Sequence, residues 1–476
     1  MKKTLILFFI YGNLIIFLIC LKRGINVTPD SIQYVGAAKY LSEFKGFENP
    51  ITYWNIEDES MPMTHWPPFY PLAISIFIIF KIKPFEAAKI LNMLIFGLFC
   101  SFSFFLIFKI TKNFIISLLS GIFFSISYYT VEIFTFAWSE PLFTFLLLIN
   151  IFLLNEYLKE KEEVYKFAII PFSMLLTLTR YIGIAFLFSN FFILFLKNKR
   201  FSFFYLIISL IPISIFLFYT HFITWGIADR NFSYISGFYQ KIKEFPENLS
   251  LLFFTSLIPY KIRILIISII FLISIIFFIF KKDKFSQILI SHSIFYLFFL
   301  TIAMLFFDPG ILFDTRFLFP LFTLLAIFSI YELKKIKFLF YPLMISLIFL
   351  SFLEDLKKFP LYAINGHPFS YSKKDAYLKI CEFLKNKEVK GLIYSNYPDA
   401  VYYFTMKPAK IFPSKYFPNS LKEFEEMCKK KKINIVYIKK YPIKSYLYSL
   451  EEILNLSNFE KVYETADGVI YEEFEK

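Results

Sequence analysis

Repeated apolar stretches constrain this chain more than any other feature, because a helix of about 20 apolar residues crosses the hydrocarbon layer of a membrane. Hydrophobic residues make up 57% of the sequence and charged residues only 18%. A soluble chain of 476 residues could not bury so much apolar surface in one core. The sequence therefore predicts a polytopic α-helical membrane protein.

We predict about eleven transmembrane helices from the lengths of the apolar stretches. The stretch 166–196 is too long for one upright helix and has basic residues at both ends, so it is predicted to be a hairpin that turns near Arg180. The stretch 71–80 is apolar but short, which favours a helix in the membrane interface. The other spans are predicted at residues 4–22, 86–109, 114–130, 139–155, 203–223, 262–280, 285–307, 316–332 and 337–353.

The charge distribution indicates how the chain is oriented in the membrane. The formal net charge is +14, and with the hairpin included the lysine clusters beside the spans fall on one side, as the positive-inside rule requires. Topology explains the basic excess better than nucleic-acid binding does, so nucleic acid is not expected as a partner. The longer segments 23–70, 224–260 and 354–476 are then expected on the extracytoplasmic side of the cell membrane.

The C-terminal segment 354–476 is predicted to be a separate, water-facing α/β domain, because its apolar density falls and helical and strand-like periods alternate. Helices are predicted near 374–387, 420–431 and 446–455, with strands at 391–394 and 433–437 and a final hairpin around 466–468. The chain is thus divided into a transmembrane domain, 1–353, which includes the first outer loop 23–70, and an extracytoplasmic domain, 354–476.

The four cysteines do not indicate a metal site. Cys20 and Cys100 lie in apolar spans and Cys381 and Cys428 in the polar C-terminal segment, with no CxxC or Cys/His metal spacing. No structural zinc is expected. A disulfide between Cys381 and Cys428 is left open, with no sequence feature to support it.

Asp30 follows the first span in the segment 28–31 (TPDS) and begins a helix-like apolar pattern. As an N-cap it would satisfy backbone N–H groups at the start of that helix, and on this feature alone the cap is the better explanation. A carboxylate beside an apolar wall at the membrane surface also suits a general base or a metal ligand, because burial makes carboxylates more basic.

His65 and Tyr70 lie in the segment 64–71 (THWPPFYP). Its prolines enforce an extended chain, and its aromatic residues suit the layer of lipid headgroups. An interfacial aromatic belt therefore explains Trp66, Phe69 and Tyr70. It does not explain His65, whose imidazole can hydrogen-bond a phosphate or a sugar.

Two acidic residues, Glu132 and Glu140, bracket the second outward turn, and Pro141 follows Glu140 at the start of a span. Acidic side chains near a membrane are costly unless they are hydrated or paired, so both are candidates for function. A carboxylate at a helix start also fits the helix dipole alone. The two explanations of Glu140 carry equal weight in the sequence.

Arg180 and Arg316 are predicted at outer helix ends in a sequence where lysine supplies most of the positive charge. A guanidinium group holds phosphate oxygens with two parallel hydrogen bonds, so these arginines indicate a ligand that carries phosphate. An ion pair between Asp314 and Arg316, or anchoring to lipid headgroups, is the simpler alternative.

The features occur in a particular order: an acid in the first outer loop, the segment 64–71, a second acid at the opening of the fourth span, LTRY at 178–181 and RFLFP at 316–320. In this order the chain resembles the GT-C glycosyltransferases, specifically the family that includes protein O-mannosyltransferases and lipid A aminoarabinose transferase. The segment 395–403 (SNYPDAVYY) resembles a recurring part of the outer domain in that family. The resemblance covers most of the chain.

The resemblance implies a polyprenyl-phosphate-linked sugar as the donor, bound from the outer leaflet, and a lipid, glycan or protein as the acceptor. Asp30 is then expected to be the catalytic acid/base, and Glu140 the second acidic residue. The residues expected to bind substrate are His65, Tyr70, Arg180 and Arg316.

The chain also departs from the family pattern. It has Asp30-Ser31 where a pair of acidic residues is usual, and Glu140 where aspartate is usual. Both differences bear on metal binding. The identity of any metal is therefore left open, including a divalent cation near Asp30.

The sequence and the resemblance together predict an inverting glycosyltransferase. Its leaving group is a phosphate, so the protein needs only to hold that phosphate with cations, orient the acceptor and accept one proton. The alternative is a transporter or flippase of a lipid-linked envelope intermediate, which would show inverted repeats or interrupted helices near mid-membrane; the sequence has neither. The C-terminal domain is expected to influence the choice of acceptor.

Overall fold

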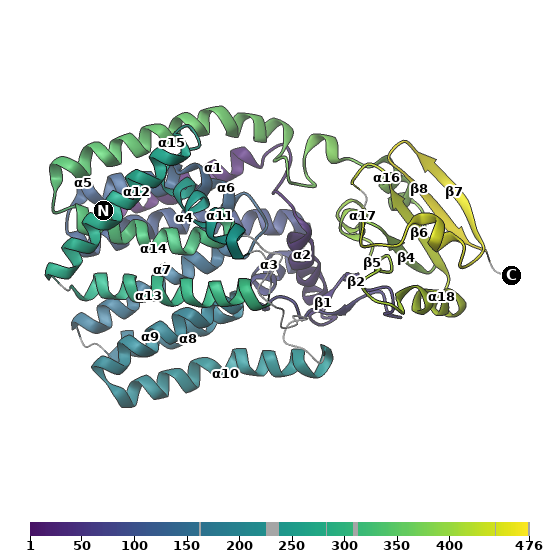
Figure 1. The fold of residues 1–476 in the computed structure, drawn as a ribbon, viewed down its shortest axis with the longest axis horizontal. Helices are drawn as coiled ribbons and strands as arrows, with labels where there is room; N and C mark the ends of the chain where they lie inside the picture. Colours follow the sequence, from purple (N-terminus) through teal and green to yellow (C-terminus); the bar gives the residue numbers. More distant parts are fainter. Residues whose placement is uncertain (161–162, 225–237, 282, 308–312, 443, 475–476) are drawn as a thin grey trace. The chain divides into compact units, whose positions relative to one another are not determined.

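The computed structural model describes residues 1–160, 163–224, 238–281, 283–307, 313–442 and 444–474. The chain forms two compact units, and each draws on segments far apart in the sequence (Figure 1). The helical unit comprises Met1–Lys22, Thr64–Tyr70 and Ala88–Ala363, and the sheet unit comprises Arg23–Met63, Pro71–Ala87 and Ile364–Lys476.

The helical unit is made of long helices joined by turns (Figure 1). The helices that contribute to it are α1 (Lys2–Ile19), α4 (Pro84–Thr111), α5 (Phe114–Ile126), α6 (Tyr128–Phe134), α7 (Glu140–Glu160), α8 (Glu163–Thr179), α9 (Ile184–Lys197), α10 (Lys199–Thr224), α11 (Phe238–Phe253), α12 (Tyr260–Lys281), α13 (Lys284–Ile302), α14 (Thr315–Leu333) and α15 (Lys337–Asn365).

The lengths of these helices fit a membrane protein. In the described residues, 7 helices are long and apolar enough to cross a membrane, and the pair α5–α6, bent by 57°, would make up to 8. Helices α8, α9 and α12 lie where the remaining spans are predicted. The predicted polytopic α-helical membrane fold is therefore confirmed. Helix α3 (Phe69–Ile79) has only 11 residues, about half of what a span needs.

The long apolar stretch 166–196 is interrupted at Arg180, as predicted. Helix α8 ends at Thr179, and a short turn, Tyr181–Gly183, precedes α9. Gly183 suits this turn because a Cβ atom there would lie 2.6 Å from the backbone of Leu176. The turn leaves Arg180 in an extended conformation between the two helices, with φ −150°.

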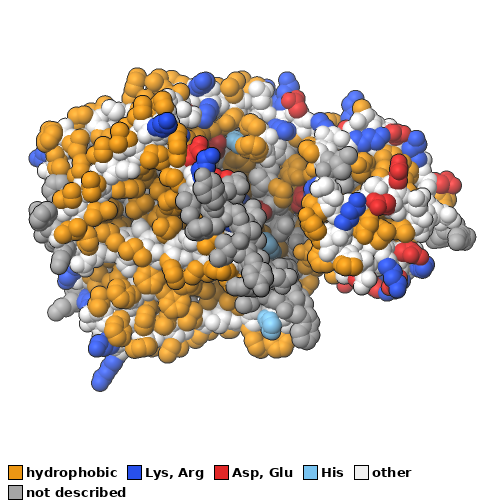
Figure 2. Space-filling model, in the orientation of Figure 1, with side chains coloured by type: hydrophobic (Ala, Val, Ile, Leu, Met, Phe, Trp, Pro, Cys, Tyr) orange, Lys and Arg blue, Asp and Glu red, His pale blue; other side chains and the backbone are white. Residues whose placement is uncertain are grey.

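The surface of the helical unit is apolar. Hydrophobic side chains cover most of its visible face in Figure 2. Large exposed side chains include Phe203, Ile207 and Ile215 on α10 and Leu265 and Leu272 on α12. Such a surface suits lipid acyl chains, whereas in water it would be strongly unfavourable.

Buried polar side chains connect α7, α8, α9 and α10 inside this unit. Nδ2 of Asn190 lies 2.8 Å from Oδ1 of Asn150, 3.2 Å from Oγ of Ser173 and 3.0 Å from the hydroxyl of Tyr205. The Tyr205 hydroxyl donates to Ser173 at 2.7 Å. All four side chains are buried. Their mutual hydrogen bonds replace partners that lipid cannot offer.

The sheet unit is built on a six-stranded mixed sheet with the order β2-β5-β4-β6-β8-β7. The first four strands are parallel, and β8 and β7 are antiparallel to their neighbours. A separate antiparallel pair joins β1 (Glu48–Asn49) to β3 (Met61–Pro62). The other elements are α2 (Pro29–Ser42), β2 (Ile51–Thr52), α16 (Lys379–Asn386), β4 (Leu392–Ser395), α17 (Pro398–Thr405), β5 (Ala409–Ile411), α18 (Ser420–Lys430), β6 (Ile433–Ile438), α19 (Leu450–Leu454), β7 (Phe459–Thr465) and β8 (Gly468–Glu473).

The sheet has an apolar core on each face, because alternate residues of a strand point to opposite sides. On β4, Ile393 packs in one core with Leu384 and Val401, whereas Tyr394 packs in the other core with Phe424. Helices α16 and α17 therefore cover one face of the sheet, and α18 covers the other.

The predicted C-terminal α/β domain is confirmed in outline. The strands predicted at 391–394 and 433–437 are present as β4 and β6, and the final hairpin is β7–β8. The helices predicted at 374–387 and 446–455 are shorter than expected, since α16 begins only at Lys379 and α19 covers five residues. All four cysteines are free thiols, so no disulfide joins the C-terminal pair.

The first loop supplies an edge strand of this sheet, which was not predicted. Ile51 of β2 lies opposite Ala409 of β5 in a parallel pairing. A strand of two residues has no measurable alternation, so its sequence gives no strand signal. The sheet is therefore completed by a segment more than 300 residues away in the chain, counted from Ile51 to Ala409.

Candidate active site

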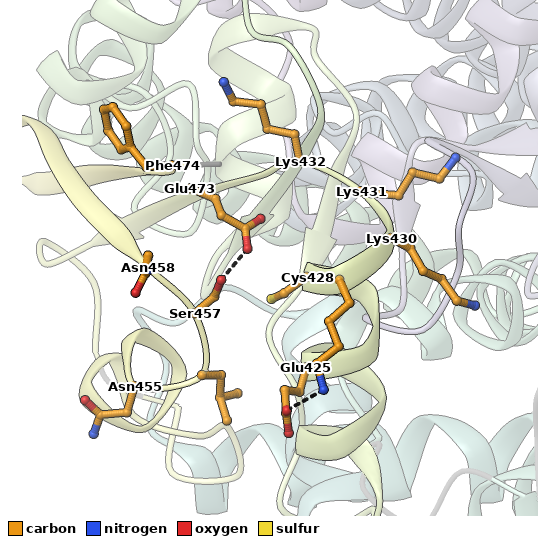
Figure 3. Close-up of a pocket in the computed structure, with 12 residues that line it drawn as sticks. Glu425, Cys428, Lys430, Lys431, Lys432, Asn455, Ser457, Asn458, Glu473 and Phe474 are labelled. Atoms are coloured by element: carbon orange, nitrogen blue, oxygen red, sulfur yellow. Dashed lines mark hydrogen bonds and ion pairs between the residues drawn. The ribbon is translucent and has the colours of Figure 1, made fainter. Parts of the chain in front are cut away.

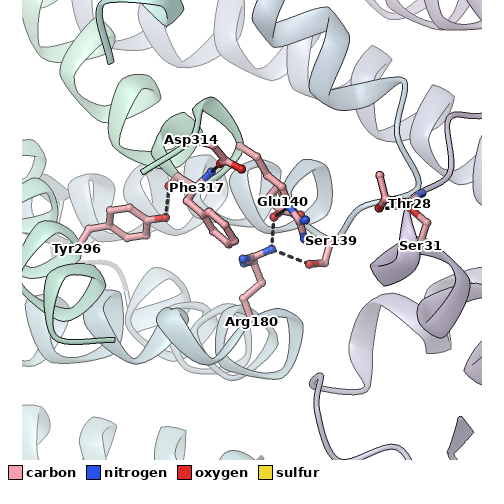
Figure 4. Close-up of polar contacts among 9 residues, drawn as sticks. Thr28, Ser31, Ser139, Glu140, Arg180, Tyr296, Asp314 and Phe317 are labelled. Atoms are coloured by element: carbon pink, nitrogen blue, oxygen red, sulfur yellow. Dashed lines mark hydrogen bonds and ion pairs between the residues drawn. The ribbon is translucent and has the colours of Figure 1, made fainter. Parts of the chain in front are cut away.

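Glu140, Arg180 and Arg316 meet inside the helical unit. Figure 4 shows Glu140 beside Arg180. Oε1 of Glu140 contacts both Nη1 of Arg180 and Nε of Arg316. Glu140 is 1% exposed and each arginine 8%, while Oε2 of Glu140 is buried and accepts no hydrogen bond from the described residues. Asp314 also interacts with both arginines, so two carboxylates and two guanidinium groups form one charge cluster, whose members would be costly to bury singly.

Aromatic rings lie against the two arginines. Cζ of Arg316 is 4.5 Å from the ring centre of Trp138 and 5.2 Å from that of Phe317, and Cζ of Arg180 is 5.4 Å from the Phe317 ring. The Trp138 ring is itself stacked on Phe136, with ring centres 4.1 Å apart. Ring faces attract guanidinium groups and so hold their planes in a fixed orientation. Trp138 and Phe317 are partly exposed, so the arginines lie near a surface that a ligand can reach.

Three helix boundaries bring the charged side chains together. Helix α7 begins at Glu140, where a carboxylate meets the positive end of the helix dipole. Arg180 lies between α8 and α9. Asp314 caps α14 by accepting a hydrogen bond from the backbone N of Phe317 at 2.9 Å, which places Arg316 in the first turn. Glu140 therefore begins a helix and also binds the arginines, while its part in function stays a prediction.

The segment that carries His65 is attached to the turn at Arg180. The hydroxyl of Tyr181 donates to the backbone O of Thr64 at 3.0 Å. This hydrogen bond joins Tyr181, which follows Arg180, to Thr64, which precedes His65. His65 is half-buried and packs edge-to-face on Trp66, with ring centres 4.6 Å apart.

Tyr70 supports the Glu140 turn from inside the protein. It is fully buried, and its hydroxyl donates to Oδ1 of Asn92 at 3.0 Å. Nδ2 of Asn92 donates in turn to the backbone oxygens of Phe134 and Phe136, which precede Glu140. Direct substrate contact by Tyr70 stays a prediction, whereas its place in this chain of hydrogen bonds is observed.

Asp30 belongs to the sheet unit and is the second residue of α2. Thr28, not Asp30, is the N-cap, and Oγ of Ser31 accepts from the backbone N of Thr28 at 3.1 Å (Figure 4). The cap explanation of Asp30 is therefore wrong. The Asp30 side chain is half-buried in the first turn of α2.

The residues around Asp30 do not form a metal site. No group of three or more His, Cys, Asp or Glu side chains that could hold a metal ion occurs in the described part of the chain. The carboxylate that interacts with Asp30 is Asp399, and Asp399 also interacts with Lys444. A lysine beside two carboxylates competes with a bound cation, so we assign no step to a metal.

A cavity of about 660 Å³ opens in the sheet unit, between α18 and the segment before β7 (Figure 3). Lys430, Lys432 and Glu473 contribute to its polar wall, and Glu473 accepts a hydrogen bond from Ser457. No residue that the sequence predicts to be catalytic or to bind substrate lines this cavity. We therefore assign it no part in the candidate site.

The arrangement of the whole chain matches solved structures of one membrane enzyme. Two structures of ArnT from Cupriavidus metallidurans, one in the apo state and one bound to undecaprenyl phosphate, match with a TM-score of 0.62 over 99% of this chain and 98% of ArnT. The chain shares the fold of ArnT. Sequence identity to ArnT is 10%, so the likeness concerns the fold. No protein-family model matches the sequence, and neither does any curated protein sequence.

Two contacts within this fold could not be anticipated from the sequence. One is the shared use of a single Glu140 oxygen by Arg180 and Arg316; the other is the role of Asn92 behind Tyr70. A signal for Asn92 existed, because a polar residue inside an apolar span is costly and usually has a specific partner.

Proposed function

We propose that the protein is a membrane glycosyltransferase that moves a sugar from a polyprenyl-phosphate-linked donor to an extracytoplasmic acceptor. The observation that supports this proposal is the buried meeting of Arg180 and Arg316 on Glu140, which holds two guanidinium groups at one place. A phosphate offers oxygens that match the planar donors of a guanidinium group.

The donors of Arg180 suit a second ligand. Within the described residues, Arg180 uses the same nitrogen, Nη1, for both Glu140 and Ser139. A guanidinium group carries five N–H donors, so its other donors are available for phosphate oxygens. The partly exposed rings of Trp138 and Phe317 offer an apolar surface for the beginning of a polyprenyl chain.

The proposed reaction is a direct displacement at the anomeric carbon of the donor sugar. An acceptor oxygen or nitrogen forms the new bond to this carbon as its bond to the phosphate oxygen breaks, and the electron pair leaves with the polyprenyl phosphate. Arg180 and Arg316 stabilise the charge that develops on that phosphate. Asp30 takes the proton that the acceptor loses, which is the task of a general base. Displacement on the side opposite the phosphate inverts the anomeric configuration.

The fold and the lipid of the matched protein support this proposal. The GT-C fold is shared with ArnT, one of whose structures holds undecaprenyl phosphate. The apolar helical unit lies in the membrane, and a polyprenyl-linked donor would be dissolved in the same membrane. We place the site and the sheet unit on the extracytoplasmic side of the cell membrane, as the distribution of lysines predicts. His65 is proposed to line the site that binds the donor sugar.

The test is sugar transfer from a radiolabelled panel of polyprenyl phosphate sugars by the purified protein in lipid bilayers, with a broad envelope extract as the acceptor. Wild type, Asp30→Asn and the control Asp58→Asn are compared, because Asp58 is an exposed acid in the same loop. Turnover that is lost in Asp30→Asn, while donor binding and the activity of Asp58→Asn persist, supports the proposal. A folded wild type that binds donors but transfers no sugar would favour the transporter or flippase instead.

A further inference from the structure

The chain just before Asp30 is bound to the segment that enters the sheet unit after α15. Ser370 is 2% exposed, and its Oγ accepts a hydrogen bond from the backbone N of Val27 at 2.8 Å. The backbone N of Tyr371 donates to the backbone O of Val27 at 2.9 Å. Both backbone groups of Val27 are therefore fixed by the C-terminal part of the chain.

The path from Val27 to Asp30 is short and stiff. Only Thr28 and Pro29 lie between them. Thr28 is held by the capping interaction with Ser31, at 3.1 Å, and Pro29 has a fixed backbone φ angle. A displacement of Val27 is consequently passed on to the Asp30 carboxylate.

Helix α17 of the sheet unit packs against α2. At the start of α17, Asp399 interacts with Asp30 near the start of α2. One turn further along α17, Tyr402 interacts with Tyr40 and Glu43, near the end of α2. These contacts place Asp399, which is 8% exposed, beside the first turn of the helix that carries Asp30.

Four titratable groups from different segments face Asp399: Lys444, Asp30, Tyr371 and Tyr446. Burial raises the pKa of Asp399 to about 6, Lys444 opposes this rise and Asp30 adds to it. At neutral pH, Asp399 therefore places a second negative charge beside Asp30. Such a charge stabilises the positive charge that develops on an acceptor as it forms the new bond.

We propose that Ser370 and Asp399 are positioning residues for Asp30, so that the C-terminal domain is part of the catalytic apparatus and not only a binding module for the acceptor. Ser370 fixes the position of the carboxylate, and Asp399 supplies a second negative charge beside it. The inference rests on the proposed function, because it concerns the proton transfer to Asp30. Neither residue is expected to contact the donor phosphate.

The kinetic test compares Ser370→Ala and Asp399→Asn with two controls in the full-length protein in bilayers. Ser414→Ala removes a buried serine hydroxyl elsewhere in the same unit, and Asp375→Asn removes an exposed acid. We expect kcat to fall about tenfold in Ser370→Ala and about fivefold in Asp399→Asn, with little change in the KM for donor, since general-base catalysis contributes factors of this size or larger. The conservative variant Asp399→Glu should recover most of the kcat. Test variants with the kcat of the controls would overturn the proposal.

A second measurement does not depend on transferase activity. Hydrogen exchange of the α2 amides, followed by mass spectrometry, should be at least about tenfold faster in Ser370→Ala than in wild type or Ser414→Ala, because the anchor of Val27 is lost. If the wild type transfers no sugar, the proposed function fails, and this measurement still decides whether Ser370 positions α2. Unchanged exchange of α2 in Ser370→Ala overturns the positioning role in either case.

Discussion

Arg316 binds Oε1 of Glu140 across a separation of 176 positions in the sequence. Arg180 binds the same oxygen, so one carboxylate aligns two guanidinium groups. A carboxylate that contacts both arginines fixes the orientation of their two guanidinium planes, and preorganised cationic donors are what a site for a phosphate leaving group requires.

The first prediction concerns the charge balance at Glu140. Glu140→Gln keeps an oxygen acceptor between the arginines but removes one negative charge beside them, so the affinity for polyprenyl phosphate should rise about tenfold. The kcat for transfer should fall at least about tenfold, because the product phosphate leaves more slowly and the arginines are less well oriented. Equilibrium binding of labelled polyprenyl phosphate and initial rates measure the two effects.

The outcome for Glu140→Gln separates two roles. Weaker lipid binding together with a lower thermal midpoint would mean that Glu140 serves only the packing of the helices, since breaking a buried ion pair is destabilising. Glu140→Asp provides the comparison, because it keeps the charge and shortens the side chain by one carbon.

The second prediction concerns the shape of the Arg316 side chain. Arg316→Lys keeps the charge but removes the planar donors and the stacking on Trp138, so the specificity constant for donor should fall about 10- to 100-fold. The matched control is Arg200→Lys, at an exposed position at the start of α10, which should leave the rates unchanged. Equal rates for wild type and Arg316→Lys would show that only the charge matters.

The membrane helices could be predicted from sequence because lipid imposes a simple requirement, a long apolar stretch. Arg180 could be singled out for the same reason, since a basic residue in the middle of an overlong apolar stretch indicates a break. The contact with Glu140 could not be predicted, because three helix boundaries that are distant in sequence meet only when the helices pack. No local pattern encodes such a meeting.

The sheet unit illustrates the same limit. Strand β4 is buried along its whole length, and a short apolar stretch between helical segments predicts such a strand well. By contrast, β2 joins the sheet through the pairing of Ile51 and Thr52 with β5. This pairing depends on the position of the first loop, which is fixed by the hydrogen bonds of Val27.

Removing everything after Glu354 would expose the side of α2 that packs on α17, so point variants at Ser370 and Asp399 are a sharper test than the deletion.

The third prediction concerns the stability of the helical unit. Asn190→Leu removes the hydrogen bonds of Asn190 to Asn150, Ser173 and Tyr205, and we expect a loss of about 1 kcal/mol, the usual size of polar contacts between membrane helices. The thermal midpoint in detergent should fall by about 2–4 °C. The control Phe192→Leu alters an exposed position on the same helix and should have little effect; an equal fall in both variants would show that the polar network adds nothing specific.

The fourth prediction concerns the pH dependence of the sheet unit. Burial raises the pKa of Asp399 from 3.8 to about 6, so the folded state binds the Asp399 proton more tightly than the unfolded state does. Stability is then greatest below pH 3.8, falls as the pH rises through about 6, and above that pH is lower by up to about 3 kcal/mol. Asp399→Asn, which cannot ionise, should therefore be more stable than wild type at pH 8 and equal to it near pH 4.

Hydrogen exchange of the β4 and β6 amides measures this effect, because it reports on the sheet unit alone. The control Asp375→Asn, an exposed acid, should match wild type at both pH values. Lower stability of Asp399→Asn at pH 8 would mean that the ionised carboxylate stabilises the fold, and the argument from burial would then fail. If Asp399→Asn is more stable than wild type at pH 8 but has a lower kcat, Asp399 serves function and not folding. Replacing a residue that served only packing would not raise the stability and lower the rate together.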